Sequence, residues 1–327
     1  MKVIIPLAGK GTRLLPITRH VPKPLIRVAG RPVMDYVMDA LEGLDVEELI
    51  FITGHLKEQV EQYVRTHYRQ PARFIEQRVQ DGTAGAVALA EPYVRGPVLI
   101  IFVDTVFDAD LSLVNREDAD GIIWAKEVED YQRFGVVVTD RHGYMTRIVE
   151  KPSEPISKLA NIGLYYIRDW ETLYAGIHRT LAQPQNKGEW FLTDAFQYMI
   201  EQGRKIRVAE VSGWYDCGKV ETVLDTNRHL LRAGRARAPA ARDGVTIVEP
   251  VRVEDGVTLE GSTIGPNVTL ETGAVVRGSV VRDAIVGERA RVEGATVRES
   301  LIGAGAAVRG GTHERMVVAH DEAAPAR

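Results

Sequence analysis

Over the first 230 residues, short apolar runs alternate with segments in which apolar residues recur at helical spacing. The apolar runs predict strands at Val3–Pro6, Leu49–Thr53, Phe74–Glu76, Val98–Val103, Ile122–Ala125, Gly135–Thr139, Thr146–Glu150 and Gly163–Ile167. The helical spacing predicts helices at Val33–Leu41, Lys57–Thr66, Asp169–Thr180 and Thr193–Gln202, and a further helix that opens near Gly82. Strands interleaved with helices favour an α/β fold with a Rossmann-like mixed sheet. The strand-rich stretch after residue 122 argues against a purely doubly wound sheet.

A second period begins at Val253 and continues to Val308. Aliphatic residues recur there every five or six positions, at 253, 259, 264, 270, 276, 281, 286, 292, 297, 302 and 308. An aliphatic residue followed by a small residue at the fifth place is the hexapeptide repeat of a parallel β-helix. With roughly 18 residues in a three-sided coil, the segment predicts three to four coils of a short left-handed β-helix. An irregular β-sandwich rich in glycine and valine is the alternative.

These two periods define the expected domains. A catalytic domain is expected over residues 1–231 and the β-helix over residues 244–312, with a tail at 313–327. Residues 232–243 are rich in alanine, arginine and proline and show no strand pattern, so we expect a linker there.

Composition narrows the class of protein. The 327 residues carry a formal net charge of -4, which gives no reason to expect nucleic acid as a partner. A site for phosphates must therefore be a local basic feature. The single cysteine, Cys217, rules out an intramolecular disulfide. No apolar run is long enough to cross a membrane, and the start of the chain is too short and glycine-rich for a signal peptide, so we expect a cytoplasmic protein without a membrane partner.

The segment that follows the first strand has the chemistry of an anion site. Gly9 and Gly11 allow the backbone N–H groups to approach phosphate oxygens, and Thr12 adds a hydroxyl donor. Arg13 offers a permanently charged, planar group suited to a pyrophosphate, and Lys23 is held between two prolines. The segment has neither the Gly-Lys-Ser/Thr of a P-loop nor the Gly-x-Gly-x-x-Gly of a dinucleotide site.

The motif over residues 8–18, read together with Lys23-Pro24, resembles the signature of the sugar nucleotidyltransferases. The resemblance covers roughly residues 1–230 and lies nearest to the glucose-1-phosphate thymidylyltransferases and uridylyltransferases. It implies that the nucleotide is bound by Leu7, Ala8, Gly9, Gly11, Thr12, Gln77, Gly82 and Thr83. A glutamine amide offers one donor and one acceptor, as does the edge of uracil or thymine. The resemblance therefore implies that Gln77 and Gly82 recognise a pyrimidine.

Two carboxylates are candidates for a magnesium site. Asp104 follows the apolar run at Val98–Val103, and the carboxyl ends of strands are where open α/β sheets bind ligands. The family more often has glycine before this aspartate and asparagine after it, so Val103 and Thr105 are departures that leave the metal role intact. Asp216 lies in a Trp-x-Asp-x-Gly segment that resembles the family's second metal carboxylate. Mg²⁺ prefers one or two carboxylates together with phosphate oxygens.

The remaining candidates concern a sugar phosphate. Glu150 can accept hydrogen bonds from sugar hydroxyls, and Lys151 can hold a phosphate. By resemblance, Gly135, Asn161, Ile162 and Trp214 form the sugar side of the site. The reaction implied is attack of a sugar 1-phosphate on the α-phosphorus of dTTP or UTP, assisted by Arg13, Lys23 and Lys151. Glucose 1-phosphate is the first expected sugar and N-acetylglucosamine 1-phosphate the second.

Two other functions remain open. The β-helix makes a bifunctional nucleotidyltransferase and acyltransferase possible, but no histidine of the kind acyltransferases use occurs between Val245 and Gly311. A homo-oligomer held by the β-helix is therefore the favoured role for that segment. The second alternative is a regulatory subunit that binds nucleotide sugars without catalysis. It is disfavoured because the arginine, both lysines and both aspartates are present.

Overall fold

The computed structural model describes residues 1–241 and 243–324. The chain forms two compact units. Unit 1 consists of residues 1–9 and 37–214, and unit 2 of residues 10–36 together with the described residues from 215 onward. The chain passes between them after Gly9, within α1 (Val33–Ala40) and within β13 (Gly213–Asp216). In this division residues 10–36 and 215–231, expected within the catalytic domain, group with the C-terminal segment.

Unit 1 is built on a nine-stranded mixed sheet, which confirms the predicted fold class. Its strands are β1 (Lys2–Pro6), β4 (Glu48–Thr53), β5 (Ala72–Glu76), β6 (Val98–Ile101), β8 (Gly121–Glu127), β9 (Gly135–Thr139), β10 (Met145–Glu150), β11 (Leu159–Ile167) and β12 (Ile206–Glu210). The order is β10-β9-β11-β6-β1-β4-β5, and β8 pairs with both β11 and β12. Strands β1, β4, β5 and β6 are parallel, whereas β11 runs antiparallel to β6 and β8. A short strand, β7 (Thr105–Asp108), follows β6 in the chain.

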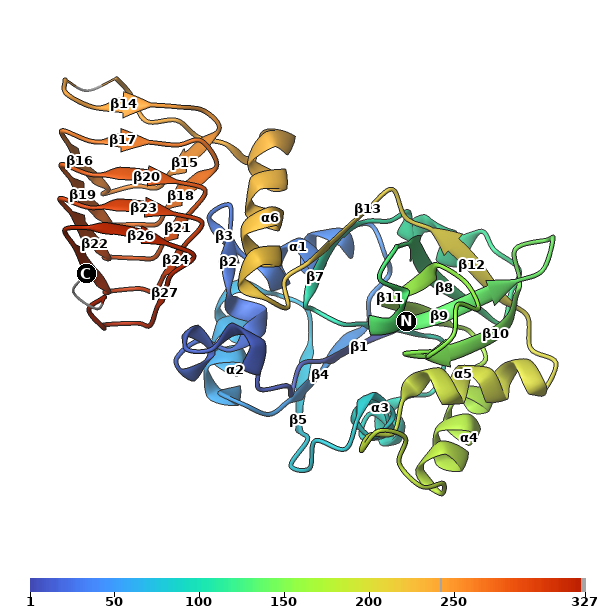
Figure 1. The fold of residues 1–327 in the computed structure, drawn as a ribbon. Helices are drawn as coiled ribbons and strands as arrows, with labels where there is room; N and C mark the ends of the chain where they lie inside the picture. Colours follow the sequence, from blue (N-terminus) through green and yellow to red (C-terminus); the bar gives the residue numbers. More distant parts are fainter. Residues whose placement is uncertain (242, 325–327) are drawn as a thin grey trace. The chain divides into compact units, whose positions relative to one another are not determined.

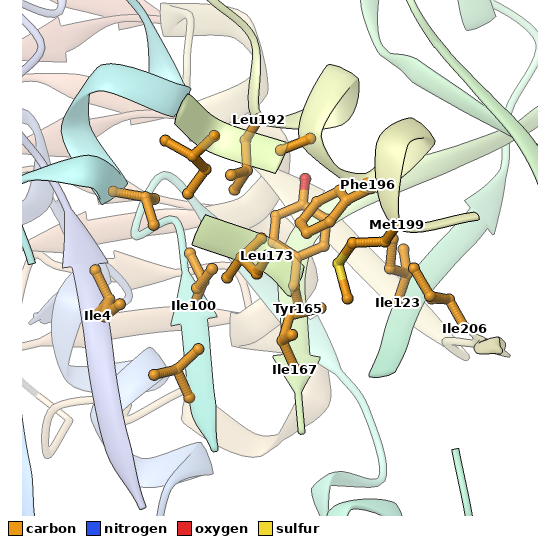
Figure 2. Packing of buried hydrophobic residues seen from close by; sticks show 14 of the residues in the cluster. Ile4, Ile100, Ile123, Tyr165, Ile167, Leu173, Leu192, Phe196, Met199 and Ile206 are labelled. Carbon is orange, nitrogen blue, oxygen red and sulfur yellow. The ribbon is translucent and has the colours of Figure 1, made fainter. Parts of the chain in front are cut away.

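Helices of unit 1 bury their apolar faces against this sheet. They are α2 (Lys57–His67), α3 (Thr83–Ala88), α4 (Trp170–Leu181) and α5 (Leu192–Glu201). Figure 2 shows Leu173 of α4 and Phe196 of α5 packed with Tyr165 of β11. Ile4 of β1 and Ile100 of β6 belong to the same buried cluster. The core therefore fixes the carboxyl ends of β1 and β6, from which the candidate residues extend.

Unit 2 contains the β-helix, seen as a stack of short parallel strands in Figure 1. Within the described residues it has two five-stranded sheets and one four-stranded sheet. Its strands are β14 (Thr246–Ile247), β15 (Val251–Val253), β16 (Thr258–Glu260), β17 (Thr263–Ile264), β18 (Val268–Leu270), β19 (Val275–Arg277), β20 (Val280–Arg282), β21 (Ile285–Val286), β22 (Arg291–Glu293), β23 (Thr296–Arg298), β24 (Leu301–Ile302), β25 (Ala307–Arg309), β26 (Thr312–Glu314) and β27 (Val317–Val318). The aliphatic residues predicted to face inward are all buried.

The β-helix is longer than the sequence pattern predicted. Equivalent residues lie 17 or 16 positions apart, as in Thr246–Thr263 and Thr296–Thr312, so each coil is shorter than the 18 residues assumed. The parallel pairing also continues past residue 312, where a tail was expected, because β26 pairs with β23 and β27 with β24. Both effects add to the predicted three to four coils.

The rest of unit 2 is small. Strands β2 (Arg27–Val28) and β3 (Arg31–Pro32) form a hairpin, and α6 (Val220–Leu230) precedes the β-helix. The side chain of Asn227 on α6 accepts hydrogen bonds from Ala29 N and from Thr269 Oγ1 of β18. This buried amide ties the hairpin, the helix and the coils together. In the described residues of both units, no helix has the length and apolar character needed to cross a bilayer.

Candidate active site

The opening segment starts at the carboxyl end of β1. Leu7 N donates to Ile52 O of the neighbouring β4, which extends the parallel pairing by one residue. The main-chain oxygen of Ala8 accepts a hydrogen bond of 2.8 Å from the Gln80 side chain. Gly9 is exposed, and a side chain there would meet nothing within 4 Å. Leu7 and Ala8 are thus fixed by unit 1, and the chain then opens to solvent at Gly9.

In unit 2 the segment continues as a tight turn that only glycine can begin. Gly11 has a φ of +62°, and a Cβ there would lie 2.9 Å from the Thr18 methyl group. The Gly11 main-chain oxygen accepts hydrogen bonds of 2.9 Å from Leu14 N and from Thr18 Oγ1. This turn leaves Thr12 and Arg13 exposed. Glycine is required here by conformation as well as by close approach.

The same turn lies beside Lys23. The Cβ of Lys23 is 3.3 Å from the position that a Cβ on Gly11 would occupy. Lys23 begins a 3₁₀ turn over Lys23–Leu25, after a proline in extended conformation. The structure therefore brings together two predicted residues that are separated by eleven positions in the sequence.

Arg13 and Asp216 are also brought together in unit 2. Gly218 N donates a hydrogen bond of 2.8 Å to Asp216 Oδ1. A Cβ on Gly218 would lie 2.8 Å from Asp216 Oδ1 and 3.2 Å from Arg13 Nη2. Both side chains therefore flank one glycine. This hydrogen bond to the main chain orients the Asp216 carboxylate.

The predicted base-binding residues have structural partners of their own. Gln77 is buried after β5, and its Nε2 donates to Asp81 Oδ1 at 3.0 Å and to Gly82 O at 3.3 Å. Gly82 has a φ of +119° and lies against the Trp190 main chain, too close for any Cβ. Thr83 Oγ1 accepts a hydrogen bond of 2.8 Å from Leu192 N. These contacts fix the conformation of the loop over residues 78–82, and the Gln77 side chain donates to its last two residues.

Asp104 lies in the turn between β6 and β7 and is half-buried. Burial raises the pKa of Tyr165 well above its ordinary value, and the negative charges of Glu150 and Asp104 raise this pKa further. The two carboxylates therefore act on the same buried phenol. The described residues contain no cluster of three or more metal-ligating side chains. One or two carboxylates completed by phosphate oxygens suit Mg²⁺ and need no such cluster.

The predicted sugar-side residues form one hydrogen-bonded group in unit 1. Asn161 Nδ2 donates to Gly135 O at 2.8 Å, and the Tyr165 hydroxyl donates to Asn161 Oδ1. Thr193 Oγ1 donates to Glu150 Oε2 at 3.3 Å. A Cβ on Gly135 would lie 2.8 Å from Glu150 Oε2, so β9, β10 and β11 converge at this glycine. Tyr165 and Thr193 were not predicted from the sequence.

Two further predicted residues flank this group. The register of β11 against β8 shifts between Asn161 and Tyr165, which places Ile162 in a bulge. The Trp214 ring packs edge-on against Phe134 at 4.9 Å between centroids. Its buried Nε1 has no hydrogen-bond partner among residues 1–241 and 243–324. A buried donor of this kind is expected to find a partner when a polar ligand binds.

Hydrogen bonds to its main-chain atoms fix the position of Lys151. It has a φ of +46°, its N donates to Phe134 O at 2.9 Å, and Lys187 Nζ donates to its main-chain oxygen at 2.8 Å. The Lys151 Nζ lies 3.8 Å from Glu150 Oε1. Lys187 was not predicted from the sequence. The structure thus adds a second cation beside Lys151.

Glu150 itself is largely buried, with 14% of its side chain exposed, and this burial raises the pKa of its carboxyl group. The charge of Lys151 and the hydrogen bond from Thr193 oppose this rise. Because burial disfavours its charged form, this carboxylate would gain from accepting hydrogen bonds from a ligand.

Comparison with known proteins shows the family to which the chain belongs. The profile of a family described as "Nucleotidyl transferase" matches residues 2–233. The chain is 34% identical over 256 residues to the bifunctional protein GlmU of Methanococcus aeolicus, covering 76% of this chain and 60% of that protein. It is 34% identical over 221 residues to the UTP–glucose-1-phosphate uridylyltransferase AglF of Haloferax volcanii, covering 65% of this chain and 89% of that protein. The chain thus spans about three fifths of the length of that bifunctional relative.

A solved structure shares the fold. A UDP-glucose pyrophosphorylase complexed with UDP-glucose superposes with a TM-score of 0.64 at 23% identity. The match covers 71% of this chain and 98% of that one. At this identity the likeness concerns the fold alone.

Proposed function

Because the chain belongs to the nucleotidyl transferase family, we propose that it joins a sugar 1-phosphate to UTP or dTTP and releases pyrophosphate. The observation that carries the proposal is the grouping of Glu150, Lys151 and Lys187 beside Asn161 and Gly135. A carboxylate and an amide suit the hydroxyls of a sugar, and two ammonium groups suit its phosphate.

The proposed reaction is an in-line attack of a sugar phosphate oxygen on the α-phosphorus. The oxygen–phosphorus bond forms as the bond to the departing pyrophosphate breaks. The nucleophile is already anionic, so no general base is needed, and catalysis reduces to positioning and neutralising charge. Lys151, with its main chain held by Lys187, binds the attacking phosphate. Lys23 binds the α-phosphate, and Arg13 with the amides of residues 9–12 binds the pyrophosphate.

We propose that Asp104 and Asp216 hold Mg²⁺. Both are hard oxygen donors, and Asp216 is oriented by Gly218 N. When bound, the ion would neutralise phosphate charge and make the α-phosphorus a better electrophile.

The choice of base and sugar is supported by the relatives. One relative is named as a UTP–glucose-1-phosphate uridylyltransferase. UTP and glucose 1-phosphate are therefore proposed first. Deoxythymidine triphosphate and N-acetylglucosamine 1-phosphate remain the next candidates. Gln77 is proposed to fix the loop of residues 78–82 against which the base lies.

For the β-helix we propose a role in assembling a homo-oligomer rather than acyl transfer. One relative is a bifunctional protein, which keeps acyl transfer as the second candidate. His313 lies in β26, inside the coils rather than after them, but it is 1% exposed and its Nε2 contacts Gly310 O. A buried imidazole cannot serve an acyl acceptor from solvent. Light scattering tests assembly, and consumption of acetyl-CoA would favour acyl transfer.

The test is a screen of five nucleoside triphosphates against four sugar 1-phosphates, read by pyrophosphate release. We expect one or two productive pairs that include UTP or dTTP. Arg13→Ala should abolish most turnover, whereas Arg19→Ala, an exposed arginine of the same segment, should not. Equal activity of Arg13→Ala and the wild type would contradict the role of Arg13.

A further inference from the structure

A cavity of about 210 Å³ lies within unit 2. One wall is the segment after that turn, which contributes four aliphatic side chains: Ile17, Val21, Leu25 and Ile26. The opposite wall is the β-helix, where Ile285 and Leu301 continue the apolar surface. A cavity of about 150 Å³ with such a lining is large enough to hold benzene. This one is therefore large enough for a small aliphatic molecule.

The β-helix leaves the floor of the cavity without side chains. Gly287 and Gly303 occupy the same place in successive coils, because Gly287 N donates to Ile302 O and Gly303 N to Val318 O. A Cβ on Gly287 would lie 2.7 Å from Ala304 N, and one on Gly303 would lie 2.7 Å from His320 N. Close stacking of the coils thus requires glycine at both positions. The result is a groove of bare backbone.

Polar groups stand at the two ends of this groove. Glu271 occupies the place of Gly287 one coil earlier, and His320 lies one coil beyond Gly303. Neighbouring strands are about 4.8 Å apart, so three coil steps separate the two ends by about 14 Å. The cavity is therefore elongated, with a mainly apolar middle, where Glu288 is the one charged side chain among the described residues of the lining, and with polar groups at both ends.

At the Glu271 end, one of the two carboxylate oxygens has no hydrogen-bond donor among the described residues. The side chain of Glu271 is 3% exposed, and its Oε2 accepts a hydrogen bond of 2.7 Å from Arg27 Nε. Its Oε1 is buried and has no partner among residues 1–241 and 243–324. Burial raises the pKa of Glu271, and Arg27 opposes that rise without cancelling it. Such a carboxylate gains from one more donor.

The carboxylate oxygen without a partner among the described residues favours a cation, and it is Glu271 Oε1. Glu288, the second carboxylate on the lining, is half-exposed, and its Oε1 is paired with the Arg289 guanidinium. The guanidinium of Arg27 is already engaged by Glu271 and by Gly30 O. At the far end, His320 Nδ1 is buried and has no hydrogen-bond partner among the described residues. Burial lowers the pKa of His320, and nearby His20 lowers it further, so the imidazole is neutral near pH 7.

We propose that this cavity binds a slender aliphatic molecule that carries a primary ammonium group, with the ammonium against Glu271 and the chain along Gly287 and Gly303. The ammonium supplies the donor that Glu271 lacks, and the chain covers the apolar walls. The proposal is independent of the nucleotidyl transfer proposed above, because it concerns binding in a separate cavity.

The probe is 1-hexylamine, compared with hexanoate of the same chain length, titrated into the full chain and followed by calorimetry and ligand-observed NMR. We expect saturable binding of hexylamine and at least tenfold weaker binding of hexanoate. A wild-type protein that binds neither compound, or that binds hexanoate as tightly as hexylamine, would overturn the proposal. This comparison needs no variant and so does not depend on the folding of one.

Variants then locate the site. Glu271→Gln keeps an acceptor for Arg27 but removes the charge, and Ala304→Phe fills the cavity; each should weaken hexylamine at least tenfold. Glu299→Gln is the matched control, because Glu299 lies on the same β-helix, 44% exposed and outside the lining. Unchanged hexylamine affinity in both folded cavity variants, or an equal loss in Glu299→Gln, would contradict the assignment.

Discussion

Lys187 Nζ donates a hydrogen bond of 2.8 Å to the main-chain oxygen of Lys151. Lys151 sits at a φ of +46°, in the left-handed region that a lysine seldom adopts. The contact therefore stabilises a strained residue and places a positive charge against the main chain of Lys151. It links the turn at residues 186–189 to the end of β10.

This relationship predicts a loss of sugar phosphate binding in Lys187→Met. We expect kcat/KM for the sugar 1-phosphate to fall by about 10- to 100-fold, because one charge contact and one main-chain restraint are lost together. Steady-state kinetics with varied sugar 1-phosphate measures this. Lys205→Met, at an exposed lysine of the same unit, is the control. A change of less than twofold in Lys187→Met would remove Lys187 from the site.

A second prediction concerns the turn at Gly11. Gly11→Ala should destabilise the protein by about 1–3 kcal/mol, because the φ of +62° is strained for alanine and the added methyl meets Thr18. Gly9→Ala should leave the unfolding free energy unchanged, since nothing lies within 4 Å of a Cβ there. Denaturant unfolding of both variants gives the comparison. Equal stabilities would show that the turn tolerates a side chain.

A third prediction is that Tyr165→Phe changes the affinity for the sugar 1-phosphate and leaves the affinity for the nucleotide unchanged. Its hydroxyl donates to Asn161, which in turn contacts Gly135 O. Tyr165→Phe frees the Asn161 amide to rotate, so KM for the sugar 1-phosphate should rise about threefold to tenfold while KM for UTP stays constant. Tyr166→Phe, on the other face of β11, is the control. A parallel rise of both KM values in Tyr165→Phe would indicate a general structural defect instead.

A fourth prediction is that Glu150→Gln raises the stability of the protein at pH 7 and lowers its activity. Its pKa is raised in the folded protein by burial, so the folded state binds a proton more readily than the unfolded chain. The stability lost to this buried charge is small below the ordinary pKa of 4.5 and grows as pH rises through the raised value. Glu150→Gln should therefore unfold at a higher temperature than wild type at pH 7, and this advantage should shrink toward pH 4.

The same variant should lose at least about tenfold in kcat/KM, because the carboxylate that accepts sugar hydroxyls is gone. Glu210→Gln, at an exposed glutamate, should change neither quantity. A Glu150→Gln protein that is less stable at pH 7 than at pH 4, relative to wild type, would contradict the burial argument.

Local periodicity predicted most strands and helices up to residue 202 and the β-helix repeat, but it missed β12 and α6. Contacts between distant segments explain the site residues that it missed. The inward aliphatic residues of the β-helix follow from a repeat that each coil imposes by itself. Lys187, Tyr165 and Thr193 carry no local signal for a site. They reach Lys151, Asn161 and Glu150 only through the pairing of β9, β10 and β11 and the packing of α5.

Glycine positions show the same limit. Gly82 is expected to help recognise a pyrimidine, and nothing in the sequence indicated that the Trp190 main chain would lie against it. The grouping of residues 10–36 with the C-terminal segment depends on contacts across about 200 positions, such as Ala29 N with Asn227. No periodicity over a short window encodes such a contact.

³¹P NMR of the purified chain with Mg²⁺, UTP and glucose 1-phosphate follows the proposed transfer of a nucleotidyl group to a sugar 1-phosphate. We expect a nucleotide sugar and pyrophosphate in equal amounts, with the phosphorus of the sugar 1-phosphate retained in the product. The Arg13→Ala protein should form little of either, and the Arg19→Ala protein should match wild type. Hydrolysis of UTP without a nucleotide sugar, or no product with any nucleotide and sugar pair of the screen, would contradict the account.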